Sequence, residues 1–203
     1  MLSGGANKAG GDTVTYIHAS AGVTVSLATS AAQNTIGAGI DKLSGFENLT
    51  GSCFSDILTG SSGANILQGL AGDDHLFGGK GNDRLIGGAG DDILTGGAGN
   101  DTFVFASAME GFDTITDFRS GADRIEVSAA GLGGGLIAGA AANLLTVQSL
   151  GDAFFSQDIG TFIFEKSGTT PGTLYWDPTG GSSDDAVPFA SLATLVTSDL
   201  FIV

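Results

Sequence analysis

Apolar side chains recur every nine residues through the middle of the chain. From Gly51 to Val104 the sequence divides into six consecutive nonapeptides, GSCFSDILT, GSSGANILQ, GLAGDDHLF, GGKGNDRLI, GGAGDDILT and GGAGNDTFV. The eighth position is always apolar, with Leu58, Leu67, Leu76, Leu85, Leu94 and Phe103 in order. The last three residues of each repeat alternate in burial as a short strand does, with the apolar side chain facing inward. The first six are rich in glycine and polar residues, which is typical of a sharp turn.

Two such repeats predict one coil of a solenoid, and the predicted fold class is all-β. Turn, strand, turn and strand close in eighteen residues, so repeats two apart lie on the same side, with stacked strands about 4.8 Å apart. The two facing inner rows are expected to be Leu58, Leu76 and Leu94, and Leu67, Leu85 and Phe103.

The predicted turns also contain acidic residues at a fixed position. Position six of the repeats is occupied by Asp56, Asn65, Asp74, Asp83, Asp92 and Asp101. Stacking brings Asp74 to Asp92 and Asp83 to Asp101, which is repulsive unless a cation lies between them. Calcium takes about six to eight oxygen ligands from carboxylates and backbone carbonyls, and these turns offer both. Zinc is disfavoured because it prefers sulfur and nitrogen ligands, and the chain has one Cys and two His.

The first two turns are expected to bind more weakly. Asn65 is neutral, and the turn of Asp56 has Ser52 and Phe54 where the pattern calls for glycine. The alternative interpretation is a solvated acidic turn in an ordinary repeat, but this does not explain why glycine recurs at positions one and four beside the acid.

Composition strengthens the case for a cation. The 203 residues include 22 acidic and 7 basic residues, for a formal net charge of −15. Such a balance argues against nucleic acid as a partner and against anionic membrane surfaces. The charge repels itself in a compact state, and the 35 glycines raise the entropy of the unfolded chain. A poorly folded metal-free form and metal-driven folding are therefore predicted.

Three expected absences follow from the rest of the sequence. No apolar run reaches the length of a membrane span, and the first residues show no secretory signal peptide. Cys53 is the only cysteine, so no disulfide forms within the chain, and we expect it to be at least half-buried.

The sequence predicts three regions. Residues 1–50 are expected to form irregular coils on the N-terminal end of the array, with Asp12 and Val14 in a broken repeat and Glu47 and Leu49 in a loose one. Residues 51–104 are the array, and residues 105–203 are a C-terminal cap with a small antiparallel sheet packed against it. Opening directly in a repeat suggests that the chain is a fragment of a longer protein.

The segment after the array carries both apolar and acidic candidates. Phe103, Phe105, Phe112 and Phe118 are expected to cover the last coil. Asp113, Asp117 and Asp123 lie close in sequence with turn residues between them. They are consistent either with one further calcium site or with ordinary solvated loop acids.

The repeats resemble the G-G-x-G-x-D-x-U-x pattern of RTX (hemolysin-type) calcium-binding proteins. The resemblance extends to the lead-in IDKLSGFENLTGSCFSDILTGSSGANILQG and to GGAGNDTFVF followed by DTITDFRSGADRIEVS. Such modules follow the catalytic domains of serralysin-type proteases, lipases and alginate epimerases. The family implies a right-handed parallel β-roll, and the ending SDLFIV resembles the tail of proteins that leave the cell through a type I exporter.

The resemblance also implies a ligand set. Calcium would be held by the carbonyls of positions one, two and four and by the acid at position six. The three turns that match fully are Gly78, Gly79, Gly81 and Asp83; Gly87, Gly88, Gly90 and Asp92; and Gly96, Gly97, Gly99 and Asp101. Partial matches are Gly69, Gly72 and Asp74, where Leu70 replaces the second glycine, Gly60, Gly63 and Asn65, and Asp56. Asp117 and Asp123 are further candidate metal ligands.

The leading functional hypothesis is a secreted calcium-binding module, with several Ca²⁺ ions as cofactors, that folds outside the cell and supports type I secretion. A second is an adhesive module that binds a polysaccharide or a protein through its sheets. Several outward positions are apolar, among them Ile57, Ile66 and Phe77, so the flanking segments or another chain are expected to cover them. A third, an enzyme, is disfavoured because His18 and His75 form no zinc motif and no G-x-S-x-G element occurs.

Overall fold

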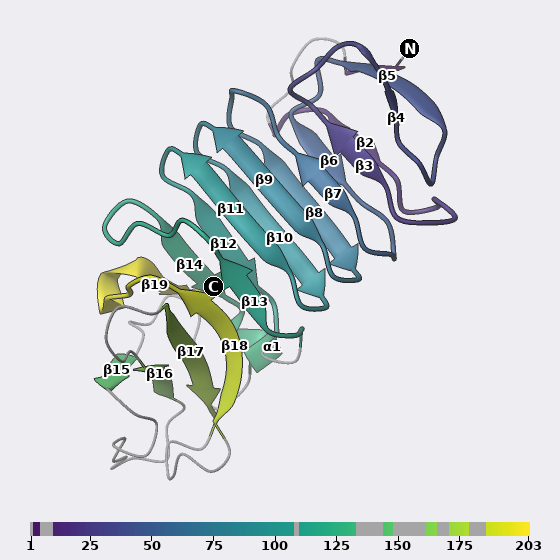
Figure 1. Cartoon of the computed structure of the whole chain (residues 1–203). Helices are drawn as coiled ribbons and strands as arrows, with labels where there is room; N and C mark the ends of the chain where they lie inside the picture. The colour runs from purple at the N-terminus through teal and green to yellow at the C-terminus, as the bar shows by residue number, and fades with distance from the viewer. Residues whose placement is uncertain are drawn as a thin grey trace.

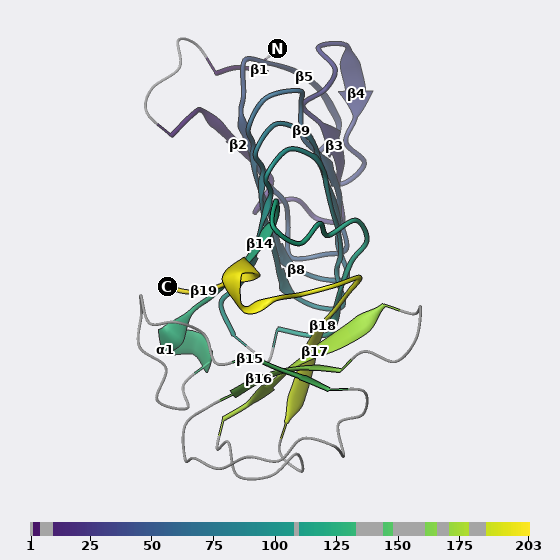
Figure 2. The ribbon, with the colours of Figure 1, turned by 90° about the vertical axis from the view of Figure 1, so that its left-hand side faces the viewer.

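The chain winds into a flattened roll whose coils stack from the N-terminal end towards a C-terminal cap. The computed structural model describes residues 2–4, 10–107, 110–132, 144–147, 161–165, 171–178 and 186–203. Figure 1 shows the strands in order along the roll, and Figure 2 shows its two sheets facing each other. Regular structure in these residues is almost entirely β, as predicted, with one short helix, α1 (Ala129–Leu132), and one 3-10 turn, η3 (Thr197–Asp199).

The strands fall into three groups along the sequence. Before the array lie β1 (Leu2–Ser3), β2 (Thr13–Thr15), β3 (Thr24–Ser26), β4 (Ala32–Asn34), β5 (Ile40–Ser44) and β6 (Asn48–Thr50). The array contains β7 (Ile57–Thr59), β8 (Ile66–Ala71), β9 (His75–Lys80), β10 (Arg84–Ala89), β11 (Ile93–Ala98) and β12 (Thr102–Phe105). After it come β13 (Asp113–Ile115), β14 (Arg124–Val127), β15 (Leu144–Val147), β16 (Thr161–Glu165), β17 (Gly172–Asp177), β18 (Val187–Leu192) and β19 (Leu200–Ile202).

Two parallel sheets form the walls of the roll. The seven-stranded sheet has the order β19-β14-β12-β10-β8-β6-β2, and every neighbouring pair in it is parallel. The nine-stranded sheet has the order β15-β16-β17-β18-β13-β11-β9-β7-β3 and is parallel from β3 to β18. Because successive strands of the array alternate between the two sheets, each coil takes two repeats.

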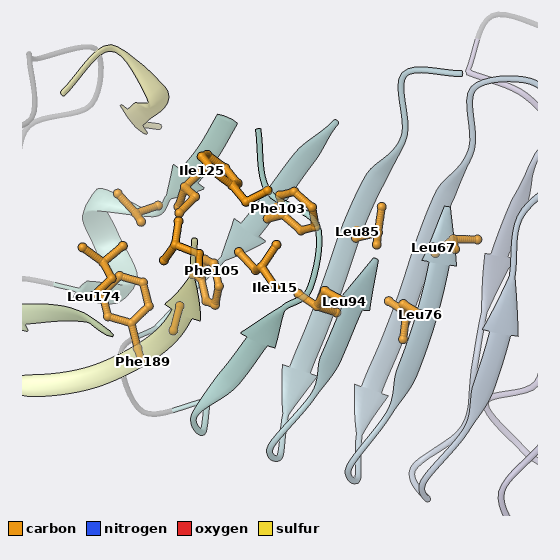
Figure 3. Close-up of a cluster of buried hydrophobic side chains, with 14 of the residues drawn as sticks. Leu67, Leu76, Leu85, Leu94, Phe103, Phe105, Ile115, Ile125, Leu174 and Phe189 are labelled. Carbon is orange, nitrogen blue, oxygen red and sulfur yellow. The ribbon is translucent and has the colours of Figure 1, made fainter. Parts of the chain in front are cut away.

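The core runs along the inside of the roll in the two predicted rows. On the nine-stranded sheet, Leu58 pairs in register with Leu76 and Leu76 with Leu94. On the facing sheet, Leu67 pairs with Leu85 and Leu85 with Phe103. All six side chains are fully buried (Figure 3). The nine-residue period therefore translates directly into stacking, because each eighth position returns to the same inner row.

The N-terminal strands extend both rows. Val14 in β2 pairs with Leu49 in β6, which lies next to β8, and Val25 in β3 pairs with Leu58. These side chains are buried, as expected for Val14 and Leu49. A separate three-stranded sheet, β1-β5-β4, lies at this end of the roll.

The C-terminal cap continues the roll rather than packing against it. The expected antiparallel strands are present, with β16 pairing antiparallel to β17 and β17 to β18. However, β18 pairs in parallel with β13, so the cap extends the nine-stranded sheet, and β19 pairs in parallel with β14 at the end of the other sheet. The expectation of a separate sheet is wrong because the strand edges of the last coil are left open and take up these segments.

Some side chains differ in exposure from the expectation. Phe103, Phe105 and Phe118 are buried at the end of the array, but Phe112 is 38% exposed. Cys53 is exposed rather than half-buried, because it lies in the turn outside the roll. Ile57, Ile66 and Phe77 are exposed, so the described flanking segments do not cover them. None of the helices in the described residues has the length and apolarity needed to cross a membrane.

Candidate metal centre

The turns of the roll lie along two edges. On one edge the chain passes from the nine-stranded to the seven-stranded sheet through turns that end at Asn65, Asp83, Asp101 and Asp123, and we call it the Asp83 edge. On the other it returns through turns that end at Asp56, Asp74, Asp92 and Asp113, and we call it the Asp92 edge.

A ladder of hydrogen bonds joins the acids of each edge from coil to coil. The backbone N–H of Asp74 donates to Oδ1 of Asp92 over 2.8 Å, and that of Asp83 donates to Oδ1 of Asp101 over 2.9 Å. The backbone N–H of Asp56 donates in the same way to Asp74, over 2.7 Å. The predicted stacking neighbours are therefore adjacent, and Oδ1 of each acid has a partner.

The second carboxylate oxygen, Oδ2, has no hydrogen-bond partner in four of the described array acids. Oδ2 of Asp74, Asp83, Asp92 and Asp101 is buried without a hydrogen-bond partner among the described residues. Burial raises the pKa of Asp74 to about 8 and the pKa of Asp83 and Asp92 to about 6, against the opposing effect of the hydrogen bond to Oδ1. Burial also raises the pKa of Asp101. A buried, unpaired carboxylate is costly, and a cation beside it relieves that cost.

Glycine at position one leaves room for oxygens from two coils. A Cβ atom on Gly69 would lie 2.0 Å from Oδ2 of Asp74 and 2.6 Å from the carbonyl oxygen of Gly87, one coil further on. On the other edge, a Cβ on Gly78 would lie 2.5 Å from Oδ2 of Asp83. The unpaired carboxylate oxygen and a carbonyl of the next coil thus face one small space, which any larger residue would fill.

Glycines at positions two and four adopt a backbone conformation that other residues avoid. Gly79 and Gly81 have φ angles of 108° and 107°, and Gly88 and Gly90 have 105° and 135°. Leu70 has a φ angle of 91° at the equivalent position. Its carbonyl oxygen keeps the repeat geometry, since a Cβ on Gly88 would lie 2.2 Å from it. The leucine therefore follows the turn at the expense of backbone strain.

The first two turns are satisfied by the protein itself. Asp56 accepts hydrogen bonds from the backbone N–H of Ser52 (2.6 Å), the Ser52 hydroxyl (2.8 Å) and the backbone N–H of Val23 (2.7 Å). Asn65 accepts from the backbone N–H of Ser61 (2.6 Å) and donates through Nδ2 to the carbonyl of Glu47 (2.6 Å). At Asp56 the oxygen that stays unpaired in later turns, Oδ2, accepts from the backbone N–H of Ser52, and the Ser52 hydroxyl adds a bond to Oδ1.

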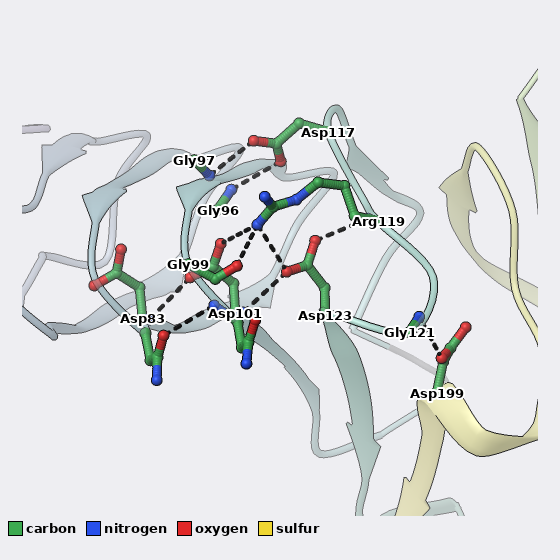
Figure 4. Close-up of polar contacts among 12 residues, drawn as sticks. Asp83, Gly96, Gly97, Gly99, Asp101, Asp117, Arg119, Gly121, Asp123 and Asp199 are labelled. Atoms are coloured by element: carbon green, nitrogen blue, oxygen red, sulfur yellow. Dashed lines mark hydrogen bonds and ion pairs between the residues drawn. The ribbon is translucent and has the colours of Figure 1, made fainter.

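The acids after the array do not form one group. Asp113 lies on the Asp92 edge, where its Oδ1 accepts from the backbone N–H of Asp92 over 3.1 Å. Asp123 lies on the Asp83 edge and accepts in the same way from Asp101 over 3.0 Å. Asp117 accepts from the backbone N–H groups of Gly96 and Gly97, at 2.9 and 2.7 Å (Figure 4). A single site made of all three acids is wrong, because the chain crosses from one edge to the other between Asp113 and Asp123.

Comparison with known proteins agrees with this geometry. Residues 50–85 and 77–115 match the family model of the RTX calcium-binding nonapeptide repeat, in four copies. Among solved structures, the chain is 34% identical to the AlgE6R3 subunit of the Azotobacter vinelandii mannuronan C5-epimerase, over 72% of this chain and 77% of that one, with a TM-score of 0.44. The chain belongs to the RTX calcium-binding repeat family. No curated protein sequence matches it.

The RTX turns of this chain suit calcium better than a side-chain-based metal. The described residues contain no cluster of three or more His, Cys, Asp or Glu side chains able to hold a metal ion. The four turns that end at Asp74, Asp83, Asp92 and Asp101 each offer one carboxylate oxygen without a hydrogen bond and several backbone carbonyls, which is the donor set that calcium prefers. The chain is therefore a calcium-binding repeat module.

Asp113 and Asp123 are candidate ligands from the sequence, but the nine-residue pattern does not show that they belong to the two ladders. Asp113 and Asp123 continue the ladder although they lie outside the nonapeptides. The signal that marks them is the spacing from acid to buried apolar residue, since Ile115 and Ile125 follow them by two residues as Leu94 follows Asp92. Loops of irregular length after the array break the nine-residue period and hide this spacing.

Proposed function

We propose that the chain is the calcium-responsive folding module of an exported protein. It stays largely unfolded where calcium is scarce and forms the roll where calcium is plentiful, outside the cell. The observation that carries this proposal is the set of four buried carboxylate oxygens, on Asp74, Asp83, Asp92 and Asp101, that have no hydrogen-bond partner among the described residues.

The proposed ligands combine those acids with the carbonyls of their turns. They are Gly69, Gly72 and Asp74; Gly78, Gly79, Gly81 and Asp83; Gly87, Gly88, Gly90 and Asp92; and Gly96, Gly97, Gly99 and Asp101. Gly60, Gly63, Asn65 and Asp56 contribute at most weakly, because the protein already satisfies the polar atoms of these two acid positions.

The net charge of the chain is consistent with folding that depends on calcium. A net charge of −15 opposes compaction until bound cations cancel part of it. Extracellular calcium modules bind at roughly 10⁻⁴–10⁻³ M, which suits a chain that passes a type I exporter unfolded and folds afterwards. We propose no catalytic role, since the buried acids of the array are already assigned to the calcium turns.

A second candidate function is attachment to a polysaccharide or protein outside the cell. It is favoured by one surface, the outer face of the nine-stranded sheet, where Ile57 and His75 lie in register and Phe77 is exposed beside them. A binding role predicts that His75→Ala and Phe77→Ala weaken attachment without changing the number of calcium ions bound.

Calcium-dependent folding tests the leading proposal. The chain is stripped with a chelator, its residual metal content is measured, and far-UV circular dichroism is recorded with no addition, with millimolar calcium and with millimolar magnesium. We expect a β spectrum only with calcium, because magnesium demands a tighter octahedral shell than these turns provide. A metal-free chain that keeps its β spectrum and its urea midpoint would contradict the proposal.

A further inference from the structure

A cationic side chain lies in the last turn of the Asp83 edge. Arg119 follows β13, one coil beyond the turn that ends at Asp101 (Figure 4). Its Nη2 atom donates to the carbonyl oxygen of Gly99 and lies 3.2 Å from Oδ1 of Asp123 and 3.9 Å from Oδ2 of Asp101. Its backbone N–H donates to Oδ2 of Asp123 over 2.8 Å.

These oxygens are the ones that the turns offer to a cation. Gly99 is position four of its repeat and Asp101 is position six, and Asp123 is the stacked acid of the next coil. The equivalent set one coil earlier is Gly81, Asp83 and Asp101. Among the described residues, no Lys or Arg forms an ion pair with Asp74, Asp83 or Asp92.

We propose that Arg119 is a built-in cation that takes the place of a calcium ion at the last turn of the Asp83 edge. The guanidinium keeps its positive charge at any ordinary pH and presents several N–H donors in a fixed fork. It therefore neutralises Asp101 and Asp123 and joins the last coil to the array without an ion of its own. This inference rests on the proposed calcium role of the turns and defines where the series of calcium sites ends. The Gly99 carbonyl, proposed above as a calcium ligand, then binds the guanidinium instead of an ion in the wild type.

The competing interpretation is an ordinary surface ion pair between Arg119 and Asp123, four residues apart. Such pairs contribute little, and the Arg119 side chain is 48% exposed. Two features favour the built-in cation. The guanidinium reaches back to Gly99, in the preceding coil, and Asp101 is 1% exposed with an Oδ2 that no hydrogen bond satisfies.

Counting calcium tests the inference. Calcium bound per chain is measured by equilibrium dialysis and atomic absorption for the wild type, Arg119→Ala and Arg124→Ala. Arg124 is a matched control, because its side chain is 49% exposed and pairs with Glu126 over 2.9 Å, and among the described residues it forms no ion pair with an acid of the turns. We expect Arg119→Ala to bind one ion more than the wild type and Arg124→Ala to bind the same number. Adding Asp123→Asn to Arg119→Ala should remove the extra ion.

The outcomes separate this inference from the proposed function. A wild type that binds no calcium would reject the proposed function itself. A wild type that binds calcium and an Arg119→Ala chain with the same count would overturn the role of Arg119 alone. An Arg119→Ala chain that stays unfolded in saturating calcium, by far-UV circular dichroism, would also overturn it, since calcium should replace the guanidinium.

Discussion

Leu70 holds a backbone conformation for which its neighbours in the stack use glycine. Its φ angle is 91°, which costs a residue with a Cβ atom about 1 kcal/mol. We predict that Leu70→Gly raises the free energy of unfolding of the calcium-loaded chain by about that amount, measured by urea denaturation. Leu70→Ala is the control, because it removes the same side chain but keeps the strain, and an equal gain from both variants would exclude backbone strain as the cause.

Asp92 and Asp56 occupy the same position of the repeat but should respond differently to truncation. Oδ2 of Asp92 has no partner, whereas three donors from Ser52 and Val23 satisfy Asp56. Asp92→Ala should lower the number of calcium ions bound and raise the calcium midpoint. Asp56→Ala should leave the count nearly unchanged but destabilise the chain by about 2 kcal/mol, because buried N–H groups lose their acceptor. Equal effects on calcium titrations would contradict this division.

The sequence predicts the acids of the turns but not all of the groups that form hydrogen bonds with them. The period alone predicts which residues stand at position six and which glycines flank them. It cannot show that the Ser52 hydroxyl turns back onto Asp56, or that Arg119 reaches across a coil to Gly99. Those contacts depend on rotamers and on loops of irregular length, which a repeat pattern does not encode.

At the scale of turns and strands, the regular stacking follows from chain geometry. An apolar residue every nine positions must return to the same wall of a two-strand coil, so the inner rows were predictable from Leu58 to Phe103. The β1-β5-β4 sheet was not, because its strands alternate weakly and lie mostly exposed. This sheet is held by backbone pairing between its strands rather than by a buried apolar face.

The turns should also make the stability of the metal-free chain depend on pH. Burial raises the pKa of Asp74 from 3.8 to about 8 and that of Asp83 and Asp92 to about 6. An acid with a raised folded pKa stabilises the fold fully below its unfolded pKa and loses that contribution as the pH rises through the folded value. The stripped chain, which we expect to be largely unfolded near neutral pH, should therefore gain β structure at pH 4 relative to pH 8, measured by far-UV circular dichroism.

Calcium binding should depend on pH in the opposite direction, and this opposite dependence serves as the control. Binding requires the carboxylates to be ionised, so calcium affinity should fall on acidification while the metal-free stability rises. Asp74→Asn should flatten the pH dependence of the stripped chain, since it removes an acid whose pKa burial raises to about 8, further than that of Asp83 or Asp92. A β signal that is stronger at pH 8 than at pH 4 without calcium would contradict the desolvated state of these turns.

For the whole molecule, the cap and the array share both sheets. The sequence indicates an apolar C-terminal tail and antiparallel strands, but not that β18 and β19 each pair with a coil strand. Those pairings join residues far apart along the chain, and their register is set by the open edge of the last coil. The cap is thus connected to the turns of the array through shared strands rather than through a domain interface.

We expect the tail to have two separable roles, one in export and one in the stability of the roll, and the last prediction concerns both. Deleting Asp199–Val203 removes β19 together with the bonds from the Ser120 hydroxyl (2.6 Å) and the Gly121 backbone N–H (3.0 Å) to Asp199. We expect the truncated chain to lose export through a matching type I exporter, because the ending resembles an export tail. It should also be less stable, since the buried Leu200 and Ile202 are lost from the core, but still bind calcium at the inner turns, whose ligands all lie in the array.

Ser120→Ala separates the signal from the strand. This variant weakens the docking of Asp199 but leaves the tail sequence intact, so it should lower the thermal midpoint slightly and export normally. Protein in the culture medium and calcium per purified chain are measured for the wild type and both variants. Normal export of the truncated chain would reject the tail as a signal. Loss of calcium binding in that chain would show that the inner turns need the cap to form, since the strands that hold them would no longer be ordered without β19.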